Sequence, residues 1–200
     1  MVAKTCNALV VLLILTFPVK AQQDSSGVSQ NGIRYTNSFL SGGLFGEKGN
    51  GNTLSFSTIH GIRYGRWMTG VGIGYDTYLD WNVMPLIGAI SFDFDRVGKN
   101  AMYIQLAGGY GIPWQREIEL EGSPSYEASG GHMINPMLGY RIKVDRYSLY
   151  VSAGYKFQRI NYSYSNQYWW WWGDSPLPTS TSHIQQDMNR ISIQIGFGLH

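Results

Sequence analysis

Alternation of apolar and polar residues is the strongest pattern in the chain. Over 147–158, the odd positions are mostly aliphatic or aromatic, and the even positions carry Ser, Tyr, Gly, Lys and Gln. The last segment, 190–199, repeats this pattern with Ile191, Ile193 and Ile195 opposite Ser192 and Gln194. A period of two over this length predicts strands and not helices.

Further segments alternate in the same way. Four of them are clear, at 67–76, 84–94, 102–114 and 138–144, and two weaker ones come first, at 33–45 and 52–64. The turn-rich stretch 46–51, Gly-Glu-Lys-Gly-Asn-Gly, separates the two weaker segments. The sequence therefore predicts eight strands.

The connections between these strands alternate between two kinds. The short ones are 64–66, 95–100 and 145–146, and the longer ones are 46–51, 77–82, 115–130 and 163–187. Outer-membrane barrels have an even number of strands, short periplasmic turns and longer external loops. We expect an all-β fold, an eight-stranded antiparallel up-and-down transmembrane β-barrel, with both termini in the periplasm.

A soluble lipocalin-like barrel has the same strand number and must be weighed against this. It would turn the apolar face inward and cover its exterior with charge. Here the polar face is mostly Gly, Ser, Ala and Gln, which suits a narrow packed lumen better than a solvated surface. Aromatic residues also gather at strand ends, which is typical of the girdles of a membrane barrel: Tyr64 and Trp67 on the turn side, and Tyr75, Tyr78, Trp81 and Trp114 on the loop side.

The first 21 residues have the features of a signal peptide. Lys4 gives a basic start, 8–17 are apolar, and Val19-Lys20-Ala21 is a small-residue cleavage pattern. We expect three parts: a cleaved signal peptide at 1–21, a short periplasmic segment at 22–32, and the barrel at 33–200. The single cysteine, Cys6, would be removed, so disulfides do not hold the mature fold.

Charge and composition narrow the possible partners. Only 14% of the 200 residues are charged, and 25 are glycine and 14 tyrosine, which is unlike a disordered tail or a coiled coil. Without Lys4 and Lys20 the mature chain has equal numbers of basic and acidic residues. No nucleic-acid partner is indicated. The expected partners are outer-membrane lipid, lipopolysaccharide and an envelope protein.

Several glycine-aromatic runs give the chain a family resemblance. They lie at 70–75, 83–88, 108–110, 130–141 and 152–156. In order and spacing they resemble the outer-membrane β-barrel domain family related to OmpX and the OmpA barrel, over nearly the whole mature chain. The resemblance implies an integral protein of the bacterial outer membrane. The chain departs from the family at its end, Phe197-Gly-Leu-His200, where such barrels usually have a terminal aromatic residue.

Charged residues fall on the face that the alternation assigns to the lumen. A structural network that closes the lumen is one interpretation, because buried charges must pair or meet water. A basic pore for small anions is the other, since basic residues exceed acidic ones in this set. The seven residues are Arg34, Arg63, Asp93, Arg141, Lys143, Lys156 and Arg190.

Motifs for catalysis, metal binding or cofactor binding are not evident. The histidines at 60, 132, 183 and 200 form no compact pattern with Ser and Glu, and no two are close enough in sequence to indicate a metal site. The run 70–74, Gly-Val-Gly-Ile-Gly, lies inside a strand with no helix after it and so fails the context of a nucleotide-binding loop. We expect no catalytic residues, no metal and no cofactor.

The most unusual segment is Tyr168-Trp169-Trp170-Trp171-Trp172, in the last long connection. Consecutive indoles there can pack on the barrel rim, lie at the lipid headgroups, stack on saccharide or contact a protein. We expect a structural or protein-interaction role through the external loops, as a subunit of an envelope complex. A membrane enzyme that modifies lipid A or phospholipid and a narrow small-solute channel are the alternatives.

Overall fold

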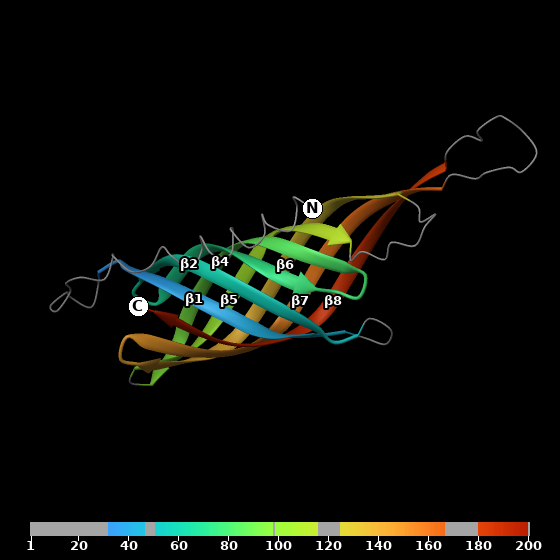
Figure 1. Ribbon diagram of the computed structural model, residues 1–200. Coiled ribbons are helices and arrows are strands. Elements are labelled where there is room, and N and C mark those ends of the chain that lie inside the picture. The colour runs from blue at the N-terminus through green and yellow to red at the C-terminus, as the bar shows by residue number, and fades with distance from the viewer. Residues whose placement is uncertain (1–31, 47–50, 98, 116–124, 167–179, 200) are drawn as a thin grey trace, which may run out of the picture. The chain divides into compact units, whose positions relative to one another are not determined.

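The computed structural model describes residues 32–46, 51–97, 99–115, 125–166 and 180–199. Its strands follow one another around a closed antiparallel barrel, in which β8 returns to pair with β1 (Figure 1). They are β1 (Arg34–Phe45), β2 (Thr53–Tyr64), β3 (Trp67–Thr77), β4 (Trp81–Val97), β5 (Asn100–Gln115), β6 (Ser125–Val144), β7 (Tyr147–Asn166) and β8 (Ser180–Leu199). The expected eight-stranded up-and-down barrel is confirmed.

The barrel lies within the unit Ile33–His200. The expected signal peptide, 1–21, and all of 22–32 except Gly32 lie outside the described residues. No helix long and apolar enough to cross a membrane occurs in the part of the chain that the structure describes.

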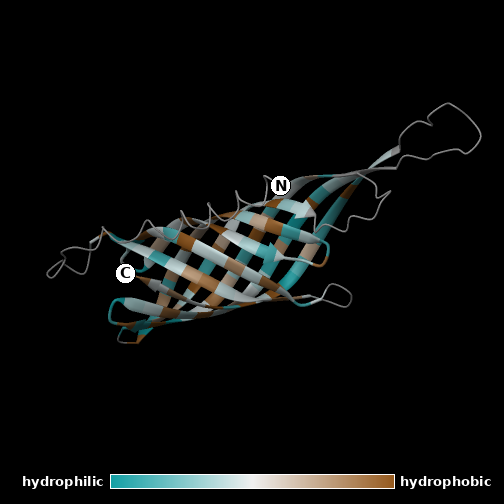
Figure 2. Cartoon of the chain, viewed as in Figure 1, coloured by the Kyte–Doolittle hydropathy of each residue, from teal (hydrophilic) through white to brown (hydrophobic). Residues whose placement is uncertain are grey.

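The alternation seen in the sequence sets which way each side chain points. In β7, Ser148, Ser152 and Lys156 are buried in the lumen, whereas Leu149 and Val151 are about half exposed on the outside. The same division holds around the barrel, so that bands of apolar and polar residues cross the strands (Figure 2). A strand surface that is apolar toward the outside matches a barrel surrounded by lipid.

Two ends of the barrel can be distinguished by their connections. We call the end with the β2–β3, β4–β5 and β6–β7 connections the turn end, and the opposite end the loop end. The first residues of the β2–β3 and β6–β7 turns, Gly65 and Asp145, have positive φ angles of 57° and 50°. Glycine adopts this conformation without steric cost and aspartate tolerates it, which explains these residues in two-residue turns.

The two longest connections are shorter than expected. Pairing of β6 with β7 starts at Ser125 and Ser165, and pairing of β7 with β8 reaches Asn166 and Ser180. The residues 125–130, 163–166 and 180–187 were expected in loops because their side chains do not alternate between apolar and polar. Backbone hydrogen bonds form the ladder whatever the side chains are, so the strands continue beyond the apolar surface.

As a consequence, the last three strands are much longer than the first three. β6, β7 and β8 have 20 residues each, against 12, 12 and 11 for β1, β2 and β3. Figure 1 shows the orange and red strands β7 and β8 reaching beyond the other strands. We call this part of β6–β8, residues 125–130, 159–166 and 180–187, the loop-end extension.

The lumen has an apolar core that the sequence did not indicate. One cluster of buried residues consists of Leu40, Ile59, Met68, Ile87, Ala89, Tyr103, Ala107, Met133 and Tyr150. A second cluster lies nearer the loop end and consists of Leu44, Tyr78, Trp81, Val83, Ile160 and Met188. Gly139 leaves space for the first cluster, because a Cβ there would lie only 2.4 Å from Cζ of Tyr103.

Two of the expected girdle residues belong to this core instead. Tyr78 and Trp81 are 2% and 4% exposed and cap the lumen, so their assignment to an external girdle is wrong. Trp81 starts β4 on the same face as Val83, and this face turns inward. Tyr64, Trp67, Tyr75 and Trp114 are exposed as expected, and the rings of Tyr75 and Trp114 are 5.8 Å apart.

Candidate functional site

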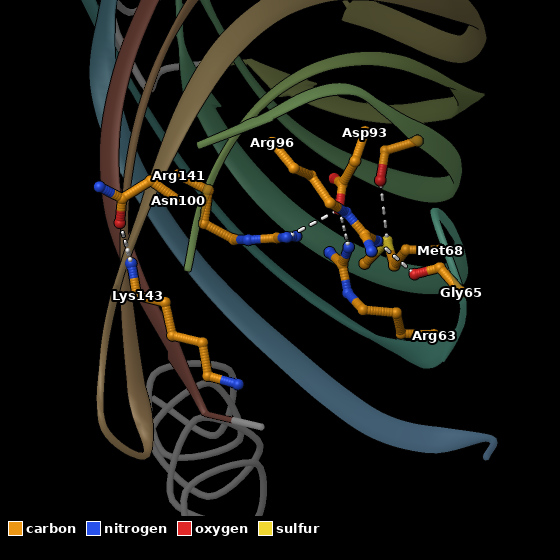
Figure 3. Close-up of polar contacts among 9 residues, drawn as sticks. Arg63, Gly65, Met68, Asp93, Arg96, Asn100, Arg141 and Lys143 are labelled. Carbon is orange, nitrogen blue, oxygen red and sulfur yellow. Dashed lines mark hydrogen bonds and ion pairs between the residues drawn. The ribbon is translucent and has the colours of Figure 1, made fainter. Parts of the chain in front are cut away.

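The turn end of the lumen contains a cluster of arginines around one carboxylate. Oδ2 of Asp93 accepts hydrogen bonds from Arg141 Nη2 at 2.7 Å, Arg63 Nη1 at 2.8 Å and Arg96 Nη2 at 3.1 Å (Figure 3). Asp93 is fully buried. The three arginines come from β2, β4 and β6, so the cluster ties strands from different parts of the barrel together.

The β2–β3 turn and a bulge in β4 position this cluster. The backbone N–H of Asp93 donates to the carbonyl of Arg66, and Arg96 donates to the carbonyl of Gly65 at 2.5 Å. The pairing of β4 with β5 shifts register between Asp93 and Asp95. The shift changes the alternation, which lets Arg96 reach the same carboxylate as the lumen residues. Alternation in the sequence does not predict that Arg96 contacts Asp93, because no residue type in this segment indicates the bulge.

A second ion pair lies deeper in the lumen, toward the loop end. Lys156 Nζ donates to Asp76 Oδ2 at 2.5 Å, and both side chains are buried. The alternation of β3 already assigns Asp76 to the lumen side, but Asp76 is missing from the expected set of lumen charges. Its carboxylate reduces the excess of basic residues that the sequence indicates.

Arg190 packs beside the apolar cap at the loop end. Its guanidinium Cζ lies 5.8 Å from the centre of the Tyr78 ring, in the range of a cation–π contact. A side chain at Gly46 would overlap the same guanidinium, so the Arg190 side chain would have to move to make room for it. Burial raises the pKa of the Tyr78 hydroxyl well above its usual value.

The seven expected lumen charges therefore separate into groups. Arg63, Asp93 and Arg141 meet at the turn end, while Lys156 and Arg190 lie toward the loop end. Lys143 is half-buried and Arg34 is exposed. Figure 3 shows the Lys143 side chain on the turn-end side of the barrel, where its backbone N–H donates to Asn100 Oδ1.

Apolar and uncharged polar side chains separate the two charged regions. Along β4 the lumen residues run from Asp93 through Ser91, Ala89, Ile87 and Pro85 to Val83 and Trp81. Buried polar residues of other strands, Gln105, Asn135 and Gln194, lie among the apolar residues of the first cluster. The lumen thus has a basic cluster, a mixed uncharged layer, the Asp76–Lys156 pair and an apolar cap. This arrangement fills the lumen with side chains, as the small diameter of eight strands requires.

The loop-end extension carries a groove on its surface, lined by both polar and apolar residues. The groove has a volume of about 640 Å³ and is lined by Glu127, Ala128, Ser129, Asn161, Tyr162, Ser163, His183, Ile184 and Gln185. Beside it, the rings of Tyr162 and Trp81 are 5.2 Å apart, which anchors the extension on the apolar cap. Arg159 and Asp187 form a two-point ion pair near its base, at 2.7 and 2.8 Å.

Three residues of this groove could not be grouped from the sequence. Ser163 is the register partner of both Glu127 and His183, so the three lie side by side across β6, β7 and β8. They are 36 and 20 positions apart in the chain, and only the strand register reveals their proximity. Ser163 lies between the other two, whereas a catalytic relay needs the histidine between the serine and the carboxylate.

The other histidines have local partners or lie elsewhere. His60 Nδ1 hydrogen-bonds with the Tyr35 hydroxyl at 2.6 Å, and its Nε2 with Thr58 Oγ1 at 3.2 Å. The His132 ring lies 5.6 Å from Phe157, and His200 is outside the described residues. No group of His, Cys, Asp and Glu that could hold a metal ion occurs among the described residues. Tyr168, Trp169, Trp170, Trp171 and Trp172 also lie outside the described residues.

Comparisons with known proteins relate the chain to small membrane barrels by fold. No protein-family model and no curated protein matches the sequence. Neisserial surface protein A has a similar crystal structure, with a TM-score of 0.55 and 13% identity over 84% of this chain and 98% of that one. The outer membrane protein AlkL, determined by solid-state NMR in lipid bilayers, gives a TM-score of 0.50 and 12% identity over 92% and 96%. At these identities the likeness establishes the shared barrel fold.

Proposed function

We propose that the chain is an integral protein of the bacterial outer membrane with a structural or protein-interaction role at the external surface. The apolar exterior of the barrel and its fold likeness to two small outer-membrane barrels support the location. The turn end and both ends of the barrel chain then face the periplasm, since outer-membrane barrels have their short turns on that side.

The loop-end extension is the observation that carries the external role. A transmembrane strand needs about 9–11 residues, and β6, β7 and β8 have 20 each. The surplus presents polar residues and a groove of about 640 Å³ beyond the apolar surface. This extra surface is not needed to cross the membrane and is therefore available to bind a partner. Its hydroxyl, amide and imidazole groups can hydrogen-bond with saccharides or with polar protein surfaces.

The filled lumen supports a surface role over a channel. Two apolar clusters cross the lumen, one on each side of the Asp76–Lys156 pair. An aqueous pathway would have to displace buried side chains such as Tyr78 and Tyr103. Packing of this kind is costly to open, because core side chains are held by close contacts on all sides.

The groove also favours binding over hydrolysis. Glu127, Ser163 and His183 are neighbours, but the serine separates the imidazole from the carboxylate. Among the described residues no hydrogen bond joins any two of them. A serine nucleophile needs a base within hydrogen-bond distance, itself oriented by a third group. These residues accordingly serve in our proposal as polar contacts for a ligand.

Affinity isolation from gently solubilised membranes tests the proposal. The tagged wild-type protein is compared with a variant in which Trp169, Trp170, Trp171 and Trp172 are all changed to Ser, and with the groove variant Asn161→Ala/His183→Ala/Gln185→Ala. We expect both variants to keep heat-modifiable migration and outer-membrane insertion, and at least one to lose a co-purifying envelope protein or lipopolysaccharide.

Matched controls separate binding from folding. Arg146→Ala changes an exposed residue at the turn end and should keep every association. If the tryptophan variant fails to fold, the indoles are rim packing. If both variants fold and every association survives, the interaction role of the loop end is wrong.

A further inference from the structure

Cationic side chains converge on the turn end of the lumen in larger number than one carboxylate can neutralise. Asp93 Oδ2 is already shared by three arginines, Arg63, Arg96 and Arg141. Two more cations, Arg34 and Lys143, extend to the same end. Arg34 and Arg63 are register partners on β1 and β2, and Lys143 lies two residues from Arg141 on the same face of β6. We call Arg34, Arg63, Arg96, Arg141 and Lys143 the turn-end basic cluster.

Nearby carboxylates do not balance this charge. Asp95 and Asp145 are exposed at the turns, and within the described residues neither forms an ion pair with a member of the cluster. Arg34 and Lys143 likewise form no ion pair with a described carboxylate. Like charges held together in a lumen of low polarity repel one another strongly, so an additional anion would be bound favourably.

The arginines also have hydrogen-bond donors to offer. Arg141 is only 7% exposed, and its Nε and Nη1 groups have no acceptor among the described residues. Nε of Arg63 also has no hydrogen-bond acceptor among the described residues. Buried N–H groups of this kind are normally satisfied, and a guanidinium presents them in a planar fork that matches the oxygens of phosphate.

Exposure increases from the base of the cluster to its rim. The side chains of Arg141 and Arg63 are 8% and 14% exposed, that of Arg96 is 38% exposed, and Arg34 is exposed. Behind the base, Met68, Tyr103 and Tyr150 close the lumen. The cluster is therefore accessible to solvent at the turn end and covered on the side of the barrel interior.

We propose that the turn-end basic cluster binds a phosphate group. Arg141 and Arg63 form the base of the site and donate hydrogen bonds through their remaining N–H groups. Lys143 adds a point charge on the wall, and Arg34 and Arg96 at the rim attract the anion. The phosphate belongs either to a soluble compound or to a phospholipid headgroup of the leaflet around the turn end, since both carry the same chemistry.

Phosphate binding to the purified full chain tests this site. The protein is refolded in a phosphorus-free glycoside detergent and titrated with inorganic phosphate by calorimetry. We expect saturable binding that is weakened about tenfold or more in Arg141→Gln and Lys143→Gln, since each removes a charge-assisted contact. Arg146→Gln is the matched control: it removes one exposed charge at the same end outside the lumen and should change affinity less than about twofold.

Folding is checked by heat-modifiable migration for every variant. Arg141→Gln alters the partners of Asp93. Lys143→Gln therefore keeps the test decisive if Arg141→Gln does not fold, because the Lys143 side chain forms no ion pair with a described carboxylate. Absence of saturable binding by the wild-type protein, or equal weakening by Arg146→Gln, overturns the proposal. Equal binding of chloride and acetate overturns the preference for phosphate.

Reconstitution distinguishes the two sources of phosphate. In nanodiscs of phosphatidylethanolamine and phosphatidylglycerol, a headgroup in the site competes, and the affinity for inorganic phosphate falls relative to glycoside detergent. Unchanged affinity in the nanodiscs assigns the site to a soluble phosphate compound. In both cases the Lys143→Gln variant must remain weaker than wild type for the proposal to stand.

Discussion

Asp93 shows how a single residue can organise one end of a barrel. Its carboxylate is fully buried and accepts hydrogen bonds from arginines of three strands. Its backbone N–H also fixes the β2–β3 turn through the carbonyl of Arg66. Loss of the carboxylate would leave several buried cations without their anion, which costs more than the pair itself contributes.

We predict that Asp93→Ala lowers the free energy of unfolding by about 3 kcal/mol, because Arg63 and Arg141 remain buried without a partner. Urea unfolding in detergent or lipid vesicles measures this difference. Asp187→Ala is the control, since that carboxylate is exposed and pairs with Arg159 at the surface. Equal urea midpoints for Asp93→Ala and wild type would contradict the buried network.

The Asp76–Lys156 pair allows a double-mutant test. Lys156→Met should reduce the free energy of unfolding by about 3 kcal/mol, because Asp76 stays buried without its cation. Asp76→Asn combined with Lys156→Met removes both charges and should recover much of that loss. The same urea experiment gives the coupling, and strictly additive effects would show that the two groups do not interact.

At the scale of elements, the strands differ most in how far they extend. At the loop end, the backbone pairing of β6, β7 and β8 continues as far as Ser125, Asn166 and Ser180. By contrast, β2 and β3 extend little beyond the apolar outer surface of the barrel. A protease needs several residues of extended, unpaired backbone in its cleft, so paired strands resist cutting. The connections at the ends of these strands are therefore the expected sites of attack.

We predict that protease added to intact cells cuts only within 116–124 or 167–179, between the long strands of the loop end. The fragments are identified by mass spectrometry. Permeabilised cells provide the control in which the turn end is also accessible. Cleavage at 95–100 in sealed cells would contradict the orientation with the turn end in the periplasm.

At the scale of the whole molecule, the barrel is closed by its sheet and also filled along its axis. β8 pairs with β1, which leaves no free edge, and two apolar clusters with two charged regions occupy the lumen. A membrane barrel obtains much of its stability from this closed hydrogen-bond ring. The filled lumen leaves the two ends as the parts available for interaction.

We predict that the wild-type protein gives no large, stable single-channel conductance in planar bilayers. The physical reason is that water would have to pass both the layer around Tyr103 and the cap around Tyr78 and Trp81. A porin inserted under the same conditions is the control for bilayer quality. A steady conductance that scales with salt concentration would instead favour the channel alternative.

The sequence by itself determined the strand number and the direction of most side chains. Alternation has a period that matches the pleat, so residue order places Lys156 and Val151 on opposite faces, and the Gly-, Ser- and Gln-rich composition of the polar face assigned Lys156 to the lumen. The family resemblance rested on the same glycine-aromatic runs and led to the same fold. Arg63, Asp93 and Arg141 could likewise be assigned to the lumen before their contacts were known.

Only the tertiary structure decided which of these residues meet. Arg96 joins Asp93 because a bulge shifts the alternation of β4, and Ser163 lies beside Glu127 and His183 because of strand register. The inward position of Tyr78 and Trp81 depends on the closure of the barrel around them. These features arise from backbone pairing and from packing between strands distant in sequence. The periodicity of side chains within one strand does not predict them.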